Sequence, residues 1–360
     1  MIAMTAAGAG AQDRPSPTDE AEAIGSLRNA KVAFPMRGER AALTYIAGDL
    51  TDAEVAELGA IAPNVRIVVA SSRGEAMTHA GDAQGVDGRF VTAEFIAAAP
   101  NLVWVQSPSA GVERFLAVAP LVENDRIVLT NMRTAHGPAI ADHAFAMLLT
   151  LTRGMREIEA NRAKGVWSQE DARPRPIALA GRTMLVVGLG GIGTEVAKRA
   201  SGFGMRVIAT RRTDSPRPDY VERVGGPGDL LAMLPEADVV AICVPLTPET
   251  DKMFGAAAFA VMKQSSYLIN VGRGRVVDTA ALMEALKSGR LAGACLDVTD
   301  PEPLPPDHPL WKMANVVISP HASADSEETD RRRWLLMREN IRRFGAGEPL
   351  LNTVDKTAGY

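Results

Sequence analysis

Short apolar runs alternate with helix-length segments along most of this chain, and this alternation limits the folds open to it. In the second half, six such runs occupy residues 183–188, 205–210, 237–244, 266–270, 292–297 and 315–320. Runs of this length, rich in valine and isoleucine, are typical of strands buried on both faces of a sheet. The segments between them are long enough for crossovers, which make consecutive strands parallel. We therefore predict an α/β fold built on a doubly wound parallel sheet.

A second, smaller α/β sheet is predicted in the first half of the chain. Its strands are expected at 42–47, 65–70, 101–106 and 126–130, and a helix is expected to begin after Thr51. A chain of 360 residues is also longer than one ordinary domain. The two series of strands thus predict two doubly wound domains.

The domain boundaries follow from the segments that flank the second series. A charged amphipathic helix is expected at 325–345, and we expect it to pack back on the first domain. The first domain then comprises 31–137 and 325–360, and the second comprises 138–324.

Two further segments differ from the rest in composition. Residues 138–155 are apolar nearly all round, which indicates a helix buried between domains or subunits, and we treat 138–180 as an interface region that ends in a linker. Residues 1–30 are small, aperiodic and rich in glycine and proline, which favours a disordered tail. A remnant of a secretory signal is the alternative, because Ala9-Gly10-Ala11 resembles a cleavage site.

Composition excludes several classes of protein. A formal net charge of −4 argues against a nucleic-acid partner, and no apolar run approaches the length of a membrane span. Cys243 and Cys295 lie in strand-like runs without metal-binding spacing, so we expect reduced core thiols in a cytoplasmic protein. We expect no metal site.

A glycine-rich motif follows the first strand of the second series. In "VVGLGGIG", Gly188, Gly190 and Gly193 have the G-x-G-x-x-G spacing and precede a helical stretch. The first glycine permits a tight turn, the second admits a pyrophosphate, and the third allows close packing of helix on strand. In this strand-motif-helix context we predict a dinucleotide site, with a purely structural turn as the alternative.

Two arginines directly follow the next strand of the series. The dinucleotide motif expects an acidic residue about 20 positions on, to bind a ribose hydroxyl, and Arg211 stands there with Arg212 beside it. Guanidinium groups would pair with the 2′-phosphate of NADP, which an acid would repel. The pair predicts NADP(H), with NAD(H) accepted at lower affinity, unless both arginines are solvated strand-end charges.

Polar residues follow the last three strands of the same sheet. Arg273, Asp297 and His321 each come directly after a strand, and Glu302 lies in a proline-rich loop after Asp297. Parallel strand ends meet at one edge of a sheet, so these groups are expected to converge on a nicotinamide. An imidazolium there could protonate a carbonyl as hydride arrives, and a neighbouring carboxylate favours its charged form. We assign no function to the other histidines, His79, His136, His143 and His308.

Taken together, these motifs resemble the D-isomer-specific 2-hydroxyacid dehydrogenase family, which includes glyoxylate/hydroxypyruvate reductases and phosphoglycerate dehydrogenases. The resemblance covers about residues 100–360. It rests on "WVQSPSAGVERF", "LVVGLGGIG", "VPLTPET", "INVGRGRVVDTAALMEAL", "AGACLDVTDPEPLPPDHPLW", "NVVISPH" and "GEPLLNTVDKTAGY". The order and spacing of these segments are far more specific than any one of them.

The resemblance implies a role for each residue of the catalytic set. It makes His321 the acid/base, Glu302 its partner, and Arg273 the residue that binds the carboxylate and carbonyl of the substrate. It also implies that backbone groups at Ala110 and Gly111 cradle that carboxylate from the other domain.

The resemblance likewise implies contacts with the cofactor. Gly191 and Ile192 would meet the pyrophosphate, Val244 and Gly272 would line the cofactor, and Asp297 would meet the nicotinamide carboxamide. Two segments depart from the family pattern and bear on the substrate: "GVERF" replaces a Gly-Val-Asp pattern, and Asp142 stands where a glutamate is usual.

At the level of the whole protein, the resemblance implies a Rossmann dinucleotide-binding domain and a smaller, discontinuous, flavodoxin-like substrate domain. It implies a homodimer joined through the region 138–180 and a small 2-oxo acid as substrate. Two alternatives stay open. The first is a cofactor-sensing interaction protein, since the fold includes corepressors. The second is a formate-type dehydrogenase, against which Glu302 counts because the resemblance places glutamine there in such enzymes.

Overall fold

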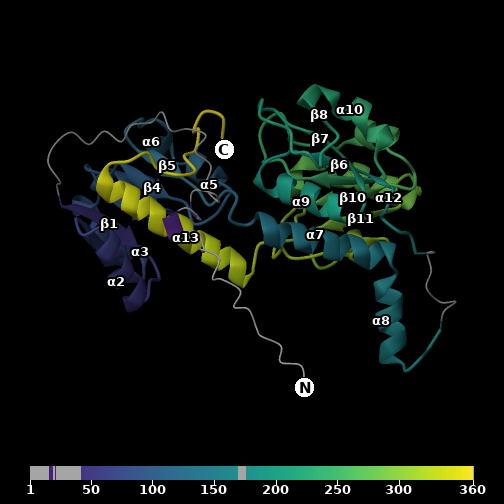
Figure 1. Ribbon diagram of the computed structural model, residues 1–360, viewed down its shortest axis with the longest axis horizontal. Coiled ribbons are helices and arrows are strands. Elements are labelled where there is room, and N and C mark those ends of the chain that lie inside the picture. The colour runs from purple at the N-terminus through teal and green to yellow at the C-terminus, as the bar shows by residue number, and fades with distance from the viewer. Residues whose placement is uncertain (1–15, 19–20, 22–41, 169–175, 360) are drawn as a thin grey trace, which may run out of the picture. The chain divides into compact units, whose positions relative to one another are not determined.

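The computed structural model describes residues 16–18, 21, 42–168 and 176–359 (Figure 1). The predicted tail or signal remnant at 1–30 therefore lies mostly outside the described residues, as does part of the linker. The chain divides into two compact units. The first ends at Arg133 and resumes at Arg331–Ala358, and the second is Thr134–Asp330 together with Gly359.

The first unit is built on a five-stranded, entirely parallel sheet in the order β2-β1-β3-β4-β5. This order is the flavodoxin-like one and confirms the predicted fold class of the smaller domain. The strands are β1 (Leu43–Ala47), β2 (Val65–Val69), β3 (Gly85–Asp87), β4 (Trp104–Gln106) and β5 (Val128–Thr130).

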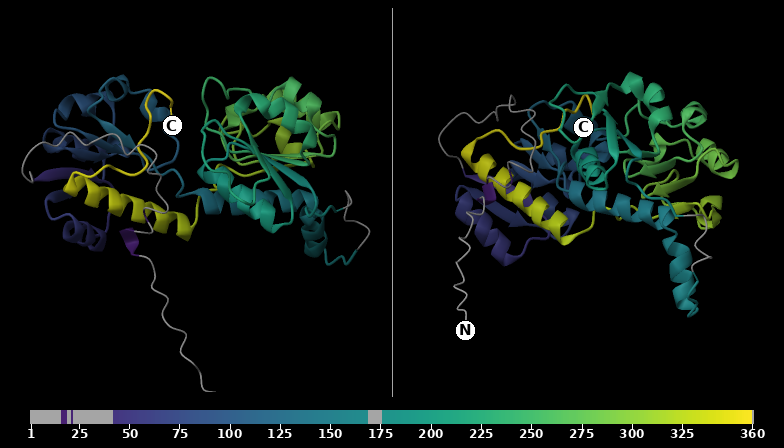
Figure 2. Two further views of the ribbon diagram at one scale, coloured as in Figure 1. Left: turned by 45° about the horizontal axis from the view of Figure 1, so that its top comes forward. Right: turned by 45° about the vertical axis from the view of Figure 1, so that its right-hand side comes forward.

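Helices cover both faces of this sheet (Figure 2). Alternate residues of a strand point to opposite faces, so Ile46 of β1 packs on one side and Tyr45 on the other. The side of Ile46 is covered by α3 (Arg73–Thr78), α4 (Ala93–Ala98), α5 (Glu113–Leu116) and α6 (Ala119–Val122). The side of Tyr45 is covered by α2 (Asp52–Ile61) and α13 (Glu327–Ala346).

The long helix α13 comes from the end of the chain and completes the core of the first unit. Its Phe344 and Ile341 are fully buried, and the Phe344 ring lies 5.0 Å from that of Trp104 on β4. The Trp104 ring in turn lies 4.9 Å from that of Tyr45. Three aromatic rings from distant parts of the sequence thus form the centre of this face.

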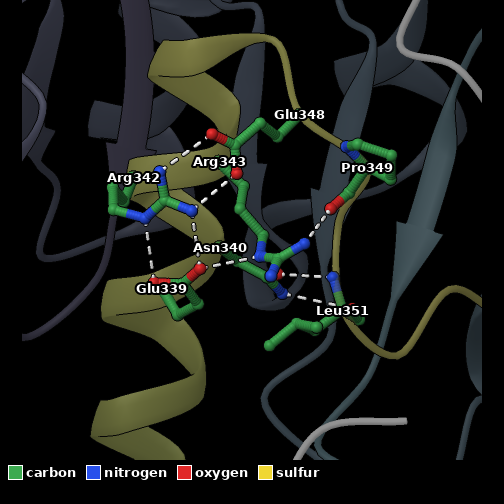
Figure 3. A network of polar contacts seen from close by, with 7 residues as sticks. All are labelled: Glu339, Asn340, Arg342, Arg343, Glu348, Pro349 and Leu351. Atoms are coloured by element: carbon green, nitrogen blue, oxygen red, sulfur yellow. Dashed lines mark hydrogen bonds and ion pairs between the residues drawn. The ribbon is translucent and has the colours of Figure 1, made fainter. Parts of the chain in front are cut away.

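A polar network joins α13 to the segment that follows it (Figure 3). The buried carboxylate of Glu339 accepts hydrogen bonds from Arg342 and Arg343, at 2.9 and 2.7 Å. Arg342 also donates to Glu348, and this hydrogen bond lowers the pKa of the Glu348 carboxyl. Arg343 donates to the carbonyl of Pro349 at 2.9 Å. A buried charge is stable only when it is paired, so the network fixes the turn at the end of the helix.

The terminal segment then runs beside β5. Thr353 forms an antiparallel bridge with Thr130, and the amide of Val354 donates to the carbonyl of Leu129 at 2.8 Å. Further on, the ammonium group of Lys356 donates to the carbonyls of Leu121, Asn124 and Ile127. The segment therefore covers the edge strand of the first sheet, whose backbone groups would otherwise lack partners.

The second unit is built on a seven-stranded parallel sheet in the order β12-β11-β10-β9-β6-β7-β8. The order reverses between β9 and β6, as in a Rossmann dinucleotide-binding sheet, and it confirms the predicted fold class. The strands are β6 (Thr183–Val187), β7 (Arg206–Thr210), β8 (Arg223–Gly225), β9 (Val239–Ile242), β10 (Tyr267–Asn270), β11 (Gly293–Leu296) and β12 (Val316–Ile318).

This sheet also has helices on both faces. One face packs against α7 (Gly137–Thr152) and α9 (Gly191–Gly202). The other packs against α10 (Leu230–Met233), α11 (Ala256–Val261) and α12 (Thr279–Lys287). Asp278 caps the start of α12, because its carboxylate accepts from the amides of Ala280 and Ala281. The apolar residues of α7 thus face α9 and the sheet of their own unit.

Helix α8 (Met155–Ala163) extends from the end of α7 away from the sheet (Figure 1). It has no buried residue, and Met155 and Ile158 are each nearly half exposed. Beyond it, Trp167 is 96% exposed. In the described ranges, no helix is both long and apolar enough to cross a bilayer.

Candidate active site

The predicted site residues of the second unit lie at one edge of its sheet. Gly188 follows β6, Arg211 follows β7, Val244 follows β9, Arg273 follows β10, and His321 follows β12. Because all seven strands are parallel, these positions share the carboxyl edge. The order of strands reverses at this edge between β9 and β6, where such sheets bind their ligands.

The glycine loop after β6 has the backbone that its motif predicts. Gly188 has φ of 98°, a left-handed conformation in which side chains are strained, and its amide donates to the carbonyl of Thr210. A side-chain carbon at Gly193 would collide with the backbone of Gly188. Only glycine at 193 therefore lets α9 approach the loop this closely.

The amino end of α9 suits a pyrophosphate. Gly190 is the N-cap, the first turn contains no acidic residue, and the amides of Gly191, Ile192 and Gly193 precede the first internal bond of the helix, from Thr194 to Gly190. A side-chain carbon at Gly190 would meet nothing within 4 Å, so this side of the loop is open. Free amides and a helix dipole both favour an anion here. The residues present thus fit a dinucleotide.

Val244 and Gly272 lie next to the glycine loop. A side-chain carbon added at Gly188 would come within 2.7 Å of Val244 Cγ1, and one added at Gly272 would come within 2.7 Å of the Val244 carbonyl. Three predicted cofactor residues from separate strands are therefore in contact. The neighbouring Cys243 is a free thiol, and burial raises its pKa to about 12. Cys295 is also free, and burial raises the pKa of its thiol as well. The cytoplasmic location stays a prediction.

The predicted arginine pair lines a pocket of about 540 Å³ beyond β7. Arg211, Arg212, Arg217 and Arg223 contribute positive charge to its walls, against the two carboxylates of Asp214 and Glu222. The Glu222 carboxylate is bonded to Arg206, and this hydrogen bond lowers its pKa. Within the described part of the chain, the Nε atom of Arg211 is buried without a hydrogen-bond partner. The pocket therefore has an excess of positive charge that suits an anion.

His321 and Glu302 form a pair. The imidazole Nδ1 lies 2.6 Å from Glu302 Oε1, and both side chains are close to half exposed. The backbone of His321 has φ of 54°, a left-handed conformation that is uncommon for a residue with a side chain. The pair has the geometry of a histidine oriented by a carboxylate.

Arg273 is held by its own loop. Asn270 donates from its side-chain amide to the Arg273 carbonyl at 2.9 Å and accepts from the Gly272 amide at 3.1 Å. The guanidinium of Arg273 donates to the Gly272 carbonyl at 2.8 Å. The buried Asn270 thus fixes the turn from which Arg273 extends.

Ala110 and Gly111 belong to the first unit, in the loop after β4. Ser109 donates from its hydroxyl to the Gly111 carbonyl, and Asn131 donates to the Ala110 carbonyl at 2.9 Å. Among described residues, no group accepts from the amides of Ala110 and Gly111. Two amides in a loop of this kind suit a carboxylate.

Sequence reasoning missed the residues that surround Asp297. Ser319 and Ser323 donate from their hydroxyls to the two oxygens of the Asp297 carboxylate, and His143 of α7 contacts Ser319. One signal was available, because serines stand two residues before and two residues after His321 in "SPHAS". No group of three or more His, Cys, Asp or Glu side chains within the described ranges could hold a metal ion.

The sequence of this chain is similar to those of known dehydrogenases and reductases. Residues 145–323 match the sequence profile of the NAD binding domain of D-isomer specific 2-hydroxyacid dehydrogenases. A glyoxylate reductase from Korarchaeum cryptofilum is 38% identical over 274 residues, which are 74% of this chain and 80% of that protein. This chain belongs to the D-isomer specific 2-hydroxyacid dehydrogenase family. It is therefore an oxidoreductase that depends on a nicotinamide dinucleotide.

Solved structures of the family extend the match to the whole fold. A D-isomer specific 2-hydroxyacid dehydrogenase from Xanthobacter autotrophicus, in complex with NADPH and MES, is 30% identical with a TM-score of 0.74. That match covers 89% of this chain and all of the other. An NADPH-dependent glyoxylate/hydroxypyruvate reductase from Sinorhizobium meliloti, in complex with NADP and sulfate, is 27% identical with a TM-score of 0.72, over 89% of this chain and 100% of that one.

Proposed function

We propose that this dehydrogenase reduces small 2-oxo acids of the glyoxylate and hydroxypyruvate type to D-2-hydroxy acids, with NADPH as reductant. The observation that carries the proposal is the His321–Glu302 pair, 2.6 Å apart, at the edge of the sheet that also holds the glycine loop. The similarity to the glyoxylate reductase of Korarchaeum and to the NADPH-dependent reductase of Sinorhizobium supports it.

In this proposal, His321 is the acid that completes the reduction. Bound NADPH supplies a hydride to the carbonyl carbon. The carbonyl oxygen then needs a proton, which a positioned imidazolium donates efficiently near neutral pH. Because Nδ1 is engaged by Glu302, the proton comes from Nε2 of His321. Glu302 fixes the orientation of the ring through this contact.

The substrate is oriented by its carboxylate. We assign this role to Arg273, whose planar guanidinium can hold a carboxylate through two parallel hydrogen bonds. We also assign a role in carboxylate binding to the backbone amides of Ala110 and Gly111, in the loop after β4. Arg273 therefore favours a 2-oxo acid as substrate. In such an acid the carbonyl is adjacent to the carboxylate, so the guanidinium that binds the carboxylate also lies beside the carbonyl.

Preference for NADPH is assigned to the arginine pocket beyond β7. A 2′-phosphate carries up to two negative charges, and the pocket offers four arginines against two carboxylates. The buried Nε of Arg211 has no hydrogen-bond partner among the described residues, and an unpaired buried donor is costly in free energy. A phosphate oxygen that accepts from it would remove this cost. Neither Arg211 nor Arg212 offers an acceptor for the 2′-hydroxyl of NADH, so NADH is expected to bind more weakly.

The experiment that tests the function is the initial rate of NADPH and NADH oxidation with glyoxylate, hydroxypyruvate, pyruvate and phenylpyruvate. We expect turnover with at least one of the first two acids, faster with NADPH, and a D-configured product wherever the product is chiral. Absence of oxidation with every acid, by folded protein that binds NADPH, would instead favour the cofactor-sensing alternative.

We also propose that the protein is a homodimer joined through the region of α8. Met155 and Ile158 are exposed on this helix, and Trp167 after it is 96% exposed. A group of exposed apolar side chains in one region suits contact with a partner surface. We expect sedimentation equilibrium to give twice the mass of one chain. The double change Ile158→Ser and Trp167→Ser should shift the protein toward monomer, whereas Leu231→Ser, at an exposed leucine on α10, should leave the mass unchanged. A wild-type monomer at micromolar concentration would overturn this proposal.

A further inference from the structure

We propose that Asn131 and Asn352 are positioning residues, which hold the loop 107–111 so that its amides at Ala110 and Gly111 bind the substrate carboxylate. The terminal segment after α13, which supplies Asn352, thereby sets the affinity for the oxo acid. The inference deepens the proposed function and rests on the role assigned there to these two amides. All the residues concerned belong to the first unit.

The carbonyls of this loop are all bound by donors of the protein. The Ser107 hydroxyl and the Met132 amide both donate to the Ser109 carbonyl, at 3.0 and 3.1 Å. The Asn131 side chain donates to the Ala110 carbonyl at 2.9 Å. The other three carbonyls, those of Ser107, Pro108 and Gly111, accept from the side chains of Gln106, Arg333 and Ser109. The backbone of the loop is therefore held by its oxygen atoms.

The direction of the two amides follows from the binding of these oxygens. In a planar trans peptide, the carbonyl of one residue and the amide of the next point in opposite directions. The Ser109 carbonyl faces the Met132 amide, so the amide of Ala110 points away from that donor. The Ala110 carbonyl faces the Asn131 side chain, so the amide of Gly111 points away from that side chain. This orientation suits a pair of amides that donate to one bound carboxylate.

Asn352 fixes the segment that contains Asn131. Its carbonyl accepts from the Asn131 amide at 3.1 Å, and its side-chain amide donates to the Arg133 carbonyl at 2.8 Å. The Asn131 side chain in turn accepts from the Arg133 amide at 3.1 Å. Asn352 has φ of 56°, a left-handed conformation that asparagine tolerates better than most residues. One residue of the terminal segment thus binds the chain on both sides of Met132.

The start of the loop is connected to the same end of the chain. Asn340 of α13 donates to Gln106 Oε1 at 3.1 Å, and Gln106 donates to the Ser107 carbonyl at 2.9 Å. Asn340 also donates to the carbonyl of Leu351 at 3.3 Å and accepts from its amide at 2.8 Å. Helix α13 and the terminal segment therefore hold the loop at both of its ends.

The three asparagines of this arrangement are buried. Asn131, Asn340 and Asn352 are each at most 3% exposed. A buried amide has to be hydrogen-bonded, and its net contribution to the stability of the fold is then small. What these hydrogen bonds supply is a fixed geometry, which we assign to the loop that the asparagines contact.

The substitution Asn352→Gly tests the inference. Glycine keeps the left-handed backbone and the carbonyl that binds Asn131, but it removes the bond to the Arg133 carbonyl. We expect KM for glyoxylate or hydroxypyruvate to rise about 3- to 10-fold, as for the loss of one hydrogen bond. We expect kcat to stay within about twofold, because the amides bind the carboxylate equally in the ground state and in the transition state. A fall in kcat at unchanged KM would overturn the inference.

Two further binding measurements separate the loop from the cofactor site. The Ki for oxamate, an unreactive analogue of a 2-oxo acid, should rise in Asn352→Gly in parallel with KM. The Kd for NADPH should stay at its wild-type value, because the glycine loop and the arginine pocket belong to the other unit. Equal weakening of oxamate and NADPH would contradict a role confined to the substrate carboxylate.

A second variant and a matched control strengthen the comparison. Asn131→Ala removes the direct bond to the Ala110 carbonyl, and it should raise KM on the order of 10- to 100-fold, as expected when a binding group is displaced. Asn64 donates in the same way to the Gly345 carbonyl at 2.9 Å, but it lies directly before β2, at the opposite edge of the sheet from the loop after β4. Asn64→Ala should keep the wild-type KM. Equal KM in Asn131→Ala and Asn64→Ala would overturn the positioning role.

One readout does not depend on turnover. Hydrogen–deuterium exchange followed by mass spectrometry reports how readily the loop opens, with no substrate present. Peptides that span residues 107–111 and 131–133 should exchange faster in Asn352→Gly and in Asn131→Ala than in Asn64→Ala. If the wild type reduces no oxo acid, the proposed function fails, but the exchange rates still decide whether the asparagines hold the loop. If Asn131→Ala does not fold, Asn352→Gly gives the same comparison. Equal exchange in Asn352→Gly and Asn64→Ala would overturn the inference.

Discussion

Replacing His321 by Gln should lower kcat for the preferred 2-oxo acid by about 100- to 10,000-fold, the usual contribution of a general acid. Glutamine keeps the polarity and approximate size of the side chain but cannot deliver a proton as an imidazolium does. The affinity for NADPH should stay within about twofold, because the glycine loop and the arginine pocket are formed by other segments. Stopped-flow hydride transfer and fluorescence titration of NADPH measure the two quantities separately.

A matched control is available at His79, which lies in the first unit at the end of α3. His79→Gln should leave kcat and the Kd for NADPH unchanged. Turnover by His321→Gln at the rate of the control would remove His321 from the mechanism. Loss of both turnover and NADPH binding in His321→Gln, with the fold intact by circular dichroism, would instead indicate that this side chain binds the cofactor.

The second large effect is expected at the arginine pair. Changing Arg211 and Arg212 together to Gln should raise the Kd for NADPH on the order of 100-fold or more, since each hydrogen bond to a charged group contributes about 1.5–3 kcal/mol. The Kd for NADH should change by less than about threefold, because NADH has no 2′-phosphate to lose contact with. Isothermal titration of the double variant with each cofactor measures this switch.

A loss of charge elsewhere on the same unit provides the control. Lys287→Gln with Lys312→Gln removes two exposed positive charges, one at the end of α12 and one shortly before β12, away from the pocket-lining residues. This variant should bind NADPH and NADH nearly as the wild type does. Equal weakening of both cofactors by the Arg211 and Arg212 changes would contradict the assignment of these residues to the 2′-phosphate.

The sequence predicted each described strand except β3 and β8. Strands β1, β6 and β7 each contain five residues, and their continuous apolar runs identify them. Strands β3 and β8 contain three residues each, Gly-Val-Asp and Arg-Val-Gly, with a single apolar side chain apiece beyond glycine. One apolar residue has no periodicity to detect, whereas β4, β5 and β12, which are equally short, lie within longer apolar runs. The pairing of neighbouring strands decides where β3 and β8 lie in their sheets.

The site residues that could be predicted are those whose motif lies within a few consecutive residues of the sequence. The glycine loop, the arginine pair and the His321 segment each combine a strand end with a distinctive residue, so topology alone places them at one edge. The supports of Asp297 were not predictable in this way. His143 meets Ser319 across 176 positions, and a serine or histidine in isolation has many ordinary roles.

The contribution of α13 to the first unit has a consequence for biosynthesis. Trp104 meets Phe344 only after nearly the whole chain has left the ribosome, whereas nearly all of the second unit is the continuous stretch Thr134–Asp330. Translation proceeds from the amino end, and domains generally fold as units once they are complete. The dinucleotide-binding unit can therefore complete its sheet before α13 is available to the amino-terminal part of the first unit.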